Sequence, residues 1–100
     1  HVLENIVYLE LLRRGCQVYT GALTGGREID FVAQKDGALA YYQVALSTLD
    51  PAVLERELAP YQKVKDNYPK YLLTLDDIFK EADYDGVQKV NLLDWLMAEP

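Results

Sequence analysis

Hydrophobic residues recur at helical spacing near the start of the chain and predict a helix there. Residues 2–14 are rich in leucine, isoleucine and valine, and the segment ends in Arg13 and Arg14. Basic residues suit the carboxyl end of a helix because they oppose its dipole, and Gly15 is a natural stop. Since aliphatic side chains lie on nearly every side of this helix, we expect it to be contacted on more than one face.

Capping residues predict the other helices. Asp50 can cap a helix whose first residue is Pro51, and this helix is expected to run over residues 51–67, bent or broken near Pro60. Two shorter helical segments are predicted in the same way, at residues 76–82 and 91–97.

Runs of β-branched, aromatic and aliphatic residues predict strands at residues 17–23, 27–34, 39–46, 70–75 and 87–90. The turn signals between them include Asp36-Gly37, which strongly favours a tight hairpin, and the segment 83–86. The predicted order is therefore α-β-β-β-α-β-(β-α). It indicates one α/β domain over residues 1–100, with a mixed β-sheet flanked by helices.

The predicted hairpin brings polar residues to the centre of the sheet. A two-residue turn at 36–37 fixes the pairing, so that Asp30 faces Gln43 and Glu28 faces Ala45. Side chains alternate along a strand, and these four are therefore expected on one side. The other side is expected to join the core through Ile29, Phe31, Tyr42, Val44 and Leu46.

The charge balance disfavours one class of partner. The chain has 16 acidic and 10 basic residues, giving a net charge of −6. Proteins that bind nucleic acids normally present a basic face to the phosphates, so protein partners are favoured here. Cys16 has no second cysteine to pair with, and no apolar run approaches the about 20 residues that span a bilayer. We therefore expect a cytoplasmic protein that does not enter a membrane.

Three parts of the chain resemble the PD-(D/E)xK motif of restriction-endonuclease-like nucleases: Glu4, residues 28–30 (EID) and residues 43–45 (QVA). In active members of that superfamily, a helix glutamate, a strand aspartate and the glutamate of ExK hold a divalent metal. The lysine of ExK orients water or steadies charge on the phosphate. The resemblance implies metal positions at Glu4, Asp30 and Gln43, and a lysine position at Ala45.

Longer runs are similar to a more specific family. Residues 3–15 (LENIVYLELLRRG) and 66–71 (DNYPKY) resemble the domain of unknown function that follows the ATPase domain in many predicted prokaryotic AAA+ ATPases. The resemblance extends over residues 2–96 and implies a restriction-endonuclease-like fold. It also implies a parent that binds ATP elsewhere. The start at His1, without an initiator methionine, agrees with a C-terminal piece of such a parent.

Two of the four motif positions depart from the pattern. Gln43 keeps a carbonyl oxygen but lacks the negative charge that Mg²⁺ prefers, and Ala45 offers neither a cation nor a hydrogen-bond donor. Phosphodiester hydrolysis depends on stabilising developing charge. We therefore expect no catalysis and no metal binding, and a vestigial site at Glu4, Asp30, Gln43 and Ala45, with Glu28 as a further candidate.

Each candidate also has a simpler interpretation. Glu4 suits the first turn of a helix as a solvated carboxylate. The carboxylate of Asp30 is expected to bond to Gln43 or to backbone donors more readily than to a metal. Glu28 is expected at the rim of the sheet, paired with Arg27 or another base. The segment 83–86 has the start of a calcium loop but lacks its later ligands, so a turn is favoured.

Two other features suggest chemistry. Lys63 and Lys65 on the second helix are candidates for a relocated nuclease lysine, although a solvated helix face explains both. Tyrosines can also stack on nucleic-acid bases. Core packing is preferred for four of them, because they stand where strands and strand entries need bulky side chains: Tyr41, Tyr42, Tyr68 and Tyr71.

The leading hypothesis is a catalytically degenerate, nuclease-like accessory domain of an AAA+ ATPase that acts in protein docking or regulation. Its partner would be its own ATPase domain, another copy of the chain or another protein. One alternative is a metal-dependent DNA nuclease with a relocated lysine, which would need Mg²⁺ at Glu4, Asp30 and Gln43. The other is a nucleic-acid-binding domain that does not cut.

Overall fold

A six-stranded mixed sheet in the order β1-β2-β3-β4-β6-β5 forms the centre of the computed structural model, which describes residues 2–24 and 27–98 but not the side chains of residues 22–24 and 27. Its strands are β1 (Gln17–Thr24), β2 (Arg27–Lys35), β3 (Ala38–Val44), β4 (Lys70–Thr74), β5 (Ala82–Tyr84) and β6 (Val87–Asn91). Strands β3, β4 and β6 are parallel to one another, while the pairs β1–β2, β2–β3 and β5–β6 are antiparallel. The expectation of an α/β domain with a mixed sheet is confirmed.

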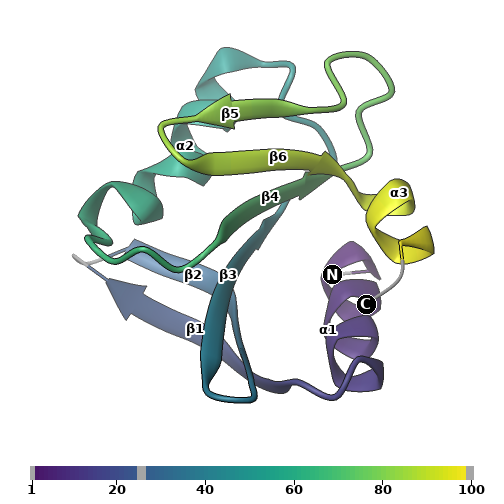
Figure 1. Ribbon diagram of the computed structural model, residues 1–100. Coiled ribbons are helices and arrows are strands. Elements are labelled where there is room, and N and C mark those ends of the chain that lie inside the picture. The colour runs from purple at the N-terminus through teal and green to yellow at the C-terminus, as the bar shows by residue number, and fades with distance from the viewer. Residues whose placement is uncertain (1, 25–26, 99–100) are drawn as a thin grey trace.

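Helices cover both faces of this sheet. They are α1 (Val2–Arg13), α2 (Pro51–Leu58), the 3₁₀ helix η1 (Ala59–Lys63) and α3 (Leu92–Met97). Helices α1 and α3 lie together beside the sheet, apart from α2 and η1 (Figure 1). Two predicted caps are confirmed: Asp50 accepts a hydrogen bond from Ala52, and Asn91 accepts one from Asp94. Within the described residues, no helix has the length and apolar character needed to cross a membrane.

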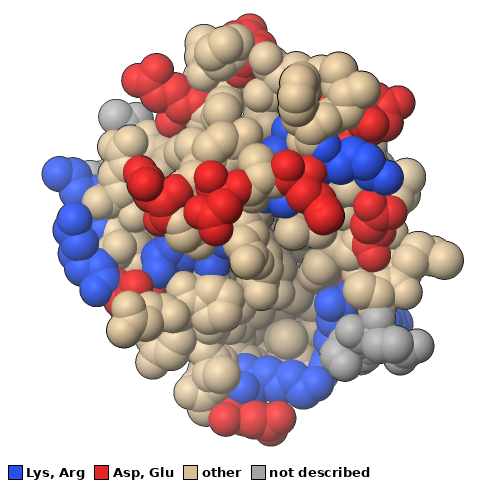
Figure 2. All heavy atoms as spheres, turned by 45° about the horizontal axis from the view of Figure 1, so that its top comes forward, with Lys and Arg blue, Asp and Glu red and all other residues tan. Residues whose placement is uncertain are grey.

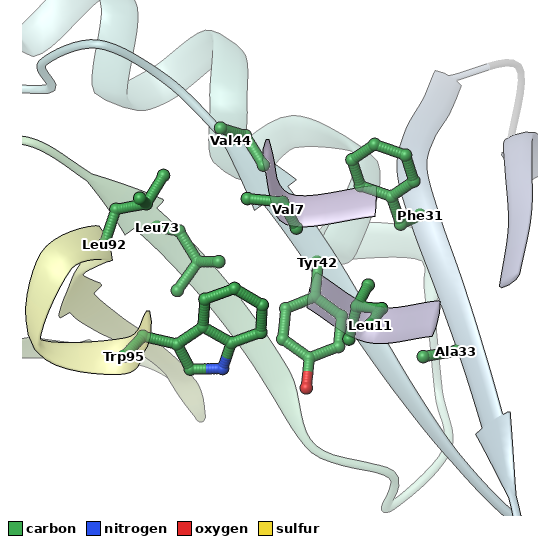
Figure 3. Packing of buried hydrophobic residues seen from close by; sticks show 9 residues of the cluster. All are labelled: Val7, Leu11, Phe31, Ala33, Tyr42, Val44, Leu73, Leu92 and Trp95. Carbon is green, nitrogen blue, oxygen red and sulfur yellow. The ribbon is translucent and has the colours of Figure 1, made fainter. Parts of the chain in front are cut away.

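The larger core lies between the sheet and the pair α1 and α3. The ring of Tyr42 stacks on Tyr71 at 5.1 Å and meets Trp95 at 5.7 Å between ring centroids. Each large apolar side chain buried here contributes about 1.5–3 kcal/mol to folding. The buried members, shown in Figure 3, are Val7, Leu11, Phe31, Ala33, Tyr42, Val44, Leu73, Leu92 and Trp95.

A smaller core lies on the opposite face, against α2 and η1. It consists of Ile29, Tyr61, Leu72 and Val87. The neighbours Leu72 and Leu73 belong to different cores, as expected for successive residues of a strand. Ile29 was expected beside Phe31, and that prediction is wrong because the alternation of faces is interrupted at Asp30. Leu46 was also expected in the core, but it lies past the end of β3 and is 69% exposed.

The second helix is shorter than predicted. Helix α2 ends at Leu58 and continues as η1, which ends at Lys63. Pro60 has no N–H with which to continue an α-helix, and the chain tightens there into the 3₁₀ form. Asp66, expected within the helix, instead accepts a hydrogen bond from the backbone N–H of Tyr68 and turns the chain toward β4.

The largest difference from the predicted order lies between β4 and β6. Residues 76–81 form an irregular segment rather than a helical turn, because Asp76 is buried and bonds to other elements. The turn expected over residues 83–86 is narrower, at Asp85-Gly86, and Ala82–Tyr84 pairs with β6 as an extra strand. Such a short strand with polar neighbours gives no clear periodicity. The observed order is therefore α-β-β-β-α-β-β-β-α.

Candidate functional site

The candidate site lies where β2 and β3 separate. The hairpin has the predicted register from Lys35–Ala38 to Phe31–Tyr42. At the next position, the backbone N–H of Asp30 donates to Oε1 of Gln43 at 2.7 Å. The backbone N–H of Val44 in turn donates to Oδ2 of Asp30 at 2.9 Å. Asp30 therefore faces Gln43 as predicted, but side chains have replaced the usual backbone ladder.

Gln43 also connects the sheet to α2. Its side chain is buried, and Nε2 donates to the carbonyl oxygen of Glu57 at 3.1 Å and to Glu57 Oε1 at 3.5 Å. An amide offers one acceptor group and one donor group, and both are engaged here. The side chain of Gln43, on β3, thus connects β3 both to β2, through Asp30, and to α2, through Glu57.

Gly21 allows the other neighbouring strand to pass close to this site. The pairs Thr20–Phe31 and Ala22–Ile29 place Gly21 of β1 opposite Asp30. Its φ of +66° is a conformation that residues with a Cβ atom rarely adopt, and an added Cβ would lie 3.0 Å from Oε1 of Glu28. This requirement for glycine was not recognised from the sequence.

Carboxylates from two elements meet around a hollow of about 440 Å³ next to Asp30. Glu4 of α1 and Glu28 of β2 line it together with Asp30, so the structure brings together these candidates from distant parts of the sequence. Gln43 reaches instead toward α2, and Ala45 lines a second hollow with Glu4. The paired register ends at Phe31–Tyr42, so Glu28 does not pair with Ala45 as predicted, and the four candidates do not all line one hollow.

Burial and like charge make this a poor place for ionised carboxyl groups. Burial raises the pKa of Asp30 despite the hydrogen bond from Val44, and Glu4 and Glu28 raise it further. Burial also raises the pKa of Glu57, and the charge of Asp30 adds to this effect. Glu57 was missed in the sequence, where it resembles an ordinary polar residue of a helix. Arg27, the suggested partner of Glu28, has a side chain outside the described part.

The oxygen atoms at the motif positions are used for structure. Gln43 Oε1 accepts from Asp30, and Asp30 Oδ2 accepts from Val44. Two of the three groups that would ligate Mg²⁺ thus already have backbone partners, and this donor set does not fit a site that binds mainly through carboxylates and water. Within residues 2–24 and 27–98, no group of three or more His, Cys, Asp or Glu side chains is arranged to hold a metal ion.

The two candidate replacement lysines lie after α2. Lys63 is the last residue of η1 and Lys65 follows it outside any helix, so placing both on one helix was wrong. Both are exposed. Lys65 lines a hollow of about 370 Å³ with Tyr61 and Tyr84, separate in its lining from the one beside Asp30.

A buried ion pair fixes the segment that follows β3. Nζ of Lys89 lies 2.8 Å from Oδ2 of Asp76, and their side chains are only 1% and 2% exposed. Burial opposes ionisation of Asp76, but Lys89, Ser47 and the N–H of Thr48 together lower its pKa to about 2. The backbone N–H of Thr48 donates to the same oxygen at 3.0 Å. The pair therefore joins β6 to the chain just after Ala45.

The predicted tyrosine packing holds for three of the four residues. Tyr42 is buried, and Tyr71 and Tyr41 are partly buried against the two cores. Tyr68 is exposed, which contradicts its expected place in the core, because the turn at Asp66 directs this segment outward.

Comparison with known proteins gives a relative but no function. The chain is 39% identical over 95 residues to a protein from Haemophilus influenzae that is named only "Uncharacterized protein". The match covers 95% of this chain and 22% of that protein, so the chain spans about a fifth of the length of its curated relative. No family model and no solved structure matches the chain.

Proposed function

We propose that this chain is a catalytically degenerate, restriction-endonuclease-like accessory domain of an AAA+ ATPase, acting in protein docking or regulation. The observation that carries the proposal is the use of Gln43 as a structural connector between Asp30 and Glu57. An active site of this motif needs an anion at that position. Ala45 adds a second deficit, because it has no cation to stabilise charge on a phosphate.

The proposed setting of the domain in a longer protein has separate support. The relative extends far beyond the matched region, since this chain corresponds to 22% of it. The runs 3–15 and 66–71 resemble the domain that follows the ATPase domain in AAA+ proteins. In this proposal, ATP binds to the preceding domain, and the present chain contacts that domain, another copy or a separate protein.

The alternatives have weaker support. A nuclease with a relocated lysine would need Lys63 or Lys65 at the phosphate, but both are exposed, Lys63 at the end of η1 and Lys65 just beyond it. A nucleic-acid-binding domain would need a basic surface. On the face seen in Figure 2, acidic and basic groups are interspersed among the residues described, without a continuous basic area. The carboxylates around Asp30 would also repel phosphates.

A cleavage assay tests the proposal. Supercoiled plasmid is incubated with the chain and Mg²⁺ or Mn²⁺, alongside the variants Asp30→Ala and Lys65→Ala. We expect no conversion to open or linear plasmid above the level of the Asp30→Ala variant, because the site lacks both the anion and the cation. Cleavage that Asp30→Ala abolishes would refute the proposal. Loss of the same cleavage in Lys65→Ala would favour the nuclease with a relocated lysine.

A further inference from the structure

The lysine position of the motif opens onto an apolar hollow. The hollow has a volume of about 260 Å³ and lies between the start of α1 and the end of β3. Its lining residues are Val2, Leu3, Glu4, Val44, Ala45 and Leu46. Large apolar side chains normally avoid water, yet Val2 is 72% exposed and Leu46 is 69% exposed at this hollow.

The volume of the hollow indicates what kind of group fits it. A closed cavity of about 150 Å³ can hold a benzene ring, whereas pockets for drug-sized ligands have volumes of about 300–1,000 Å³. At about 260 Å³, the open hollow at Ala45 suits one bulky apolar side chain better than a cofactor. A protein segment that inserts a leucine, phenylalanine or methionine would cover the methyl group of Ala45 and the exposed parts of Val2 and Leu46.

Charge next to the hollow indicates what should flank that side chain. Glu4 lines both this apolar hollow and the neighbouring one, where Glu28 and Asp30 lie. Glu57 is close enough for Asp30 and Glu4 to raise its pKa. An apolar surface bordered by several carboxylates is complementary to an apolar group bordered by a cation.

We propose that these two hollows together bind a protein segment in which a bulky apolar residue lies next to a lysine or arginine. The apolar side chain occupies the hollow at Ala45, and the cation lies beside Glu28 and Asp30. This inference rests on the proposed docking function and assigns it a surface and a partner chemistry. A small residue at the lysine position of the motif then has a role, because it leaves room for the side chain of the partner.

A peptide titration tests this assignment. The ¹⁵N-labelled chain is titrated with a synthetic peptide in which leucine and lysine alternate, and with a matched peptide of leucine and glutamate. We expect saturable changes in amide shifts at Glu4, Asp30 and Ala45 with the lysine peptide only. Equal binding of both peptides, or shifts confined to other surfaces, would overturn the proposal.

Two variants examine the apolar hollow, which both substituted residues line. Leu46→Asp changes an exposed residue and is therefore expected to fold, and it should weaken binding of the lysine peptide at least tenfold. Ala45→Trp should fill the hollow and weaken binding to a similar extent, whereas Ala38→Trp, at the exposed hairpin, should leave it unchanged. Binding retained in both Leu46→Asp and Ala45→Trp would refute the site.

The outcome for the site is distinguishable from that for the proposed function. Peptide binding that maps to another face of the folded chain would refute these two hollows but leave docking as the function. Plasmid cleavage abolished by Asp30→Ala would refute the proposed function, whatever the peptides do. Dimers that form with rising protein concentration and are lost in Leu46→Asp would identify a second copy as the occupant and overturn the partner chemistry proposed here.

Discussion

Gln43 is the residue on which the interpretation of the site depends most. Its carbonyl oxygen accepts from Asp30, and its NH₂ group donates to Glu57. A glutamate would keep the acceptor but lose the donor, and it would add a third carboxyl group beside two whose pKa values are already raised. The glutamine thus relieves a repulsion that a bound metal ion would relieve in an active nuclease.

Gln43→Glu is expected to lower the free energy of unfolding by about 1–3 kcal/mol at pH 7 without metal, because a buried donor is lost and a charge is buried. The new carboxyl group would have a raised pKa in the folded state, so the deficit should shrink as the pH falls toward 4. Urea unfolding at pH 7 and at lower pH measures this. Gln88→Glu, on an exposed position of β6, is the matched control. Equal stability of the Gln43 and Gln88 variants would contradict this account of Gln43.

At the scale of elements, the close approach of β1 to β2 beside Asp30 depends on Gly21. Strand β1 passes close to Glu28 only because residue 21 is glycine with a positive φ. Gly37 also has a positive φ, of +81°, but a Cβ there would contact nothing within 4 Å. The two glycines therefore separate the effect of backbone conformation from that of crowding.

Gly21→Ala is expected to destabilise the chain by more than Gly37→Ala. The left-handed conformation alone costs about 1–2 kcal/mol in each variant. Only the alanine at 21 would also displace Glu28, so the double variant Gly21→Ala with Glu28→Ala should recover the difference. Thermal unfolding of the native chain, the two single glycine variants and the double variant measures this difference. The same loss at both glycines would show that the contact with Glu28 carries no weight.

The ion pair of Asp76 and Lys89 joins three elements of the fold. Lys89→Met leaves a buried carboxylate without its cation and should lower the free energy of unfolding by about 3–5 kcal/mol. The double variant with Asp76→Asn should recover part of this loss. The folded pKa of Asp76, about 2, lies below its ordinary 3.8, so its contribution is present above pH 3.8 and is lost as the pH falls toward 2. A double-mutant cycle by urea unfolding at pH 7 and pH 3 measures both effects, and additive losses would contradict the coupling.

Local signals predicted most elements but not those set by distant contacts. The Asp36-Gly37 turn and the caps Asp50 and Asn91 act within a few residues, and all three were identified correctly. The irregular segment after β4 follows from the pairing of Asp76 with Lys89, which are far apart in sequence. Propensity cannot reveal such a contact, and strand β5 was missed for a related reason: it is stabilised only by pairing with β6.

At the scale of the whole molecule, the site is assembled from four elements, α1, β2, β3 and α2, which sequence reasoning covered unequally. The motif resemblance identified Glu4 and Asp30, and the structure places both at one hollow. It could not identify Glu57, because that residue lies on α2, and the position of this helix next to Gln43 is set by the fold rather than by any local sequence signal. The apolar hollow at Ala45 likewise depends on where α1 begins relative to β3, which no local pattern specifies.

The most direct test of the central claim is a calorimetric titration of Mg²⁺ and Mn²⁺ into the chain. The claim is that the amide of Gln43 and the methyl group of Ala45 have replaced the charges needed for metal-dependent chemistry. The native sequence should give no saturable heat, whereas the double variant Gln43→Glu with Ala45→Lys, shown by circular dichroism to be folded, should bind either ion. Saturable binding to the native sequence, lost in Asp30→Ala, would contradict the claim.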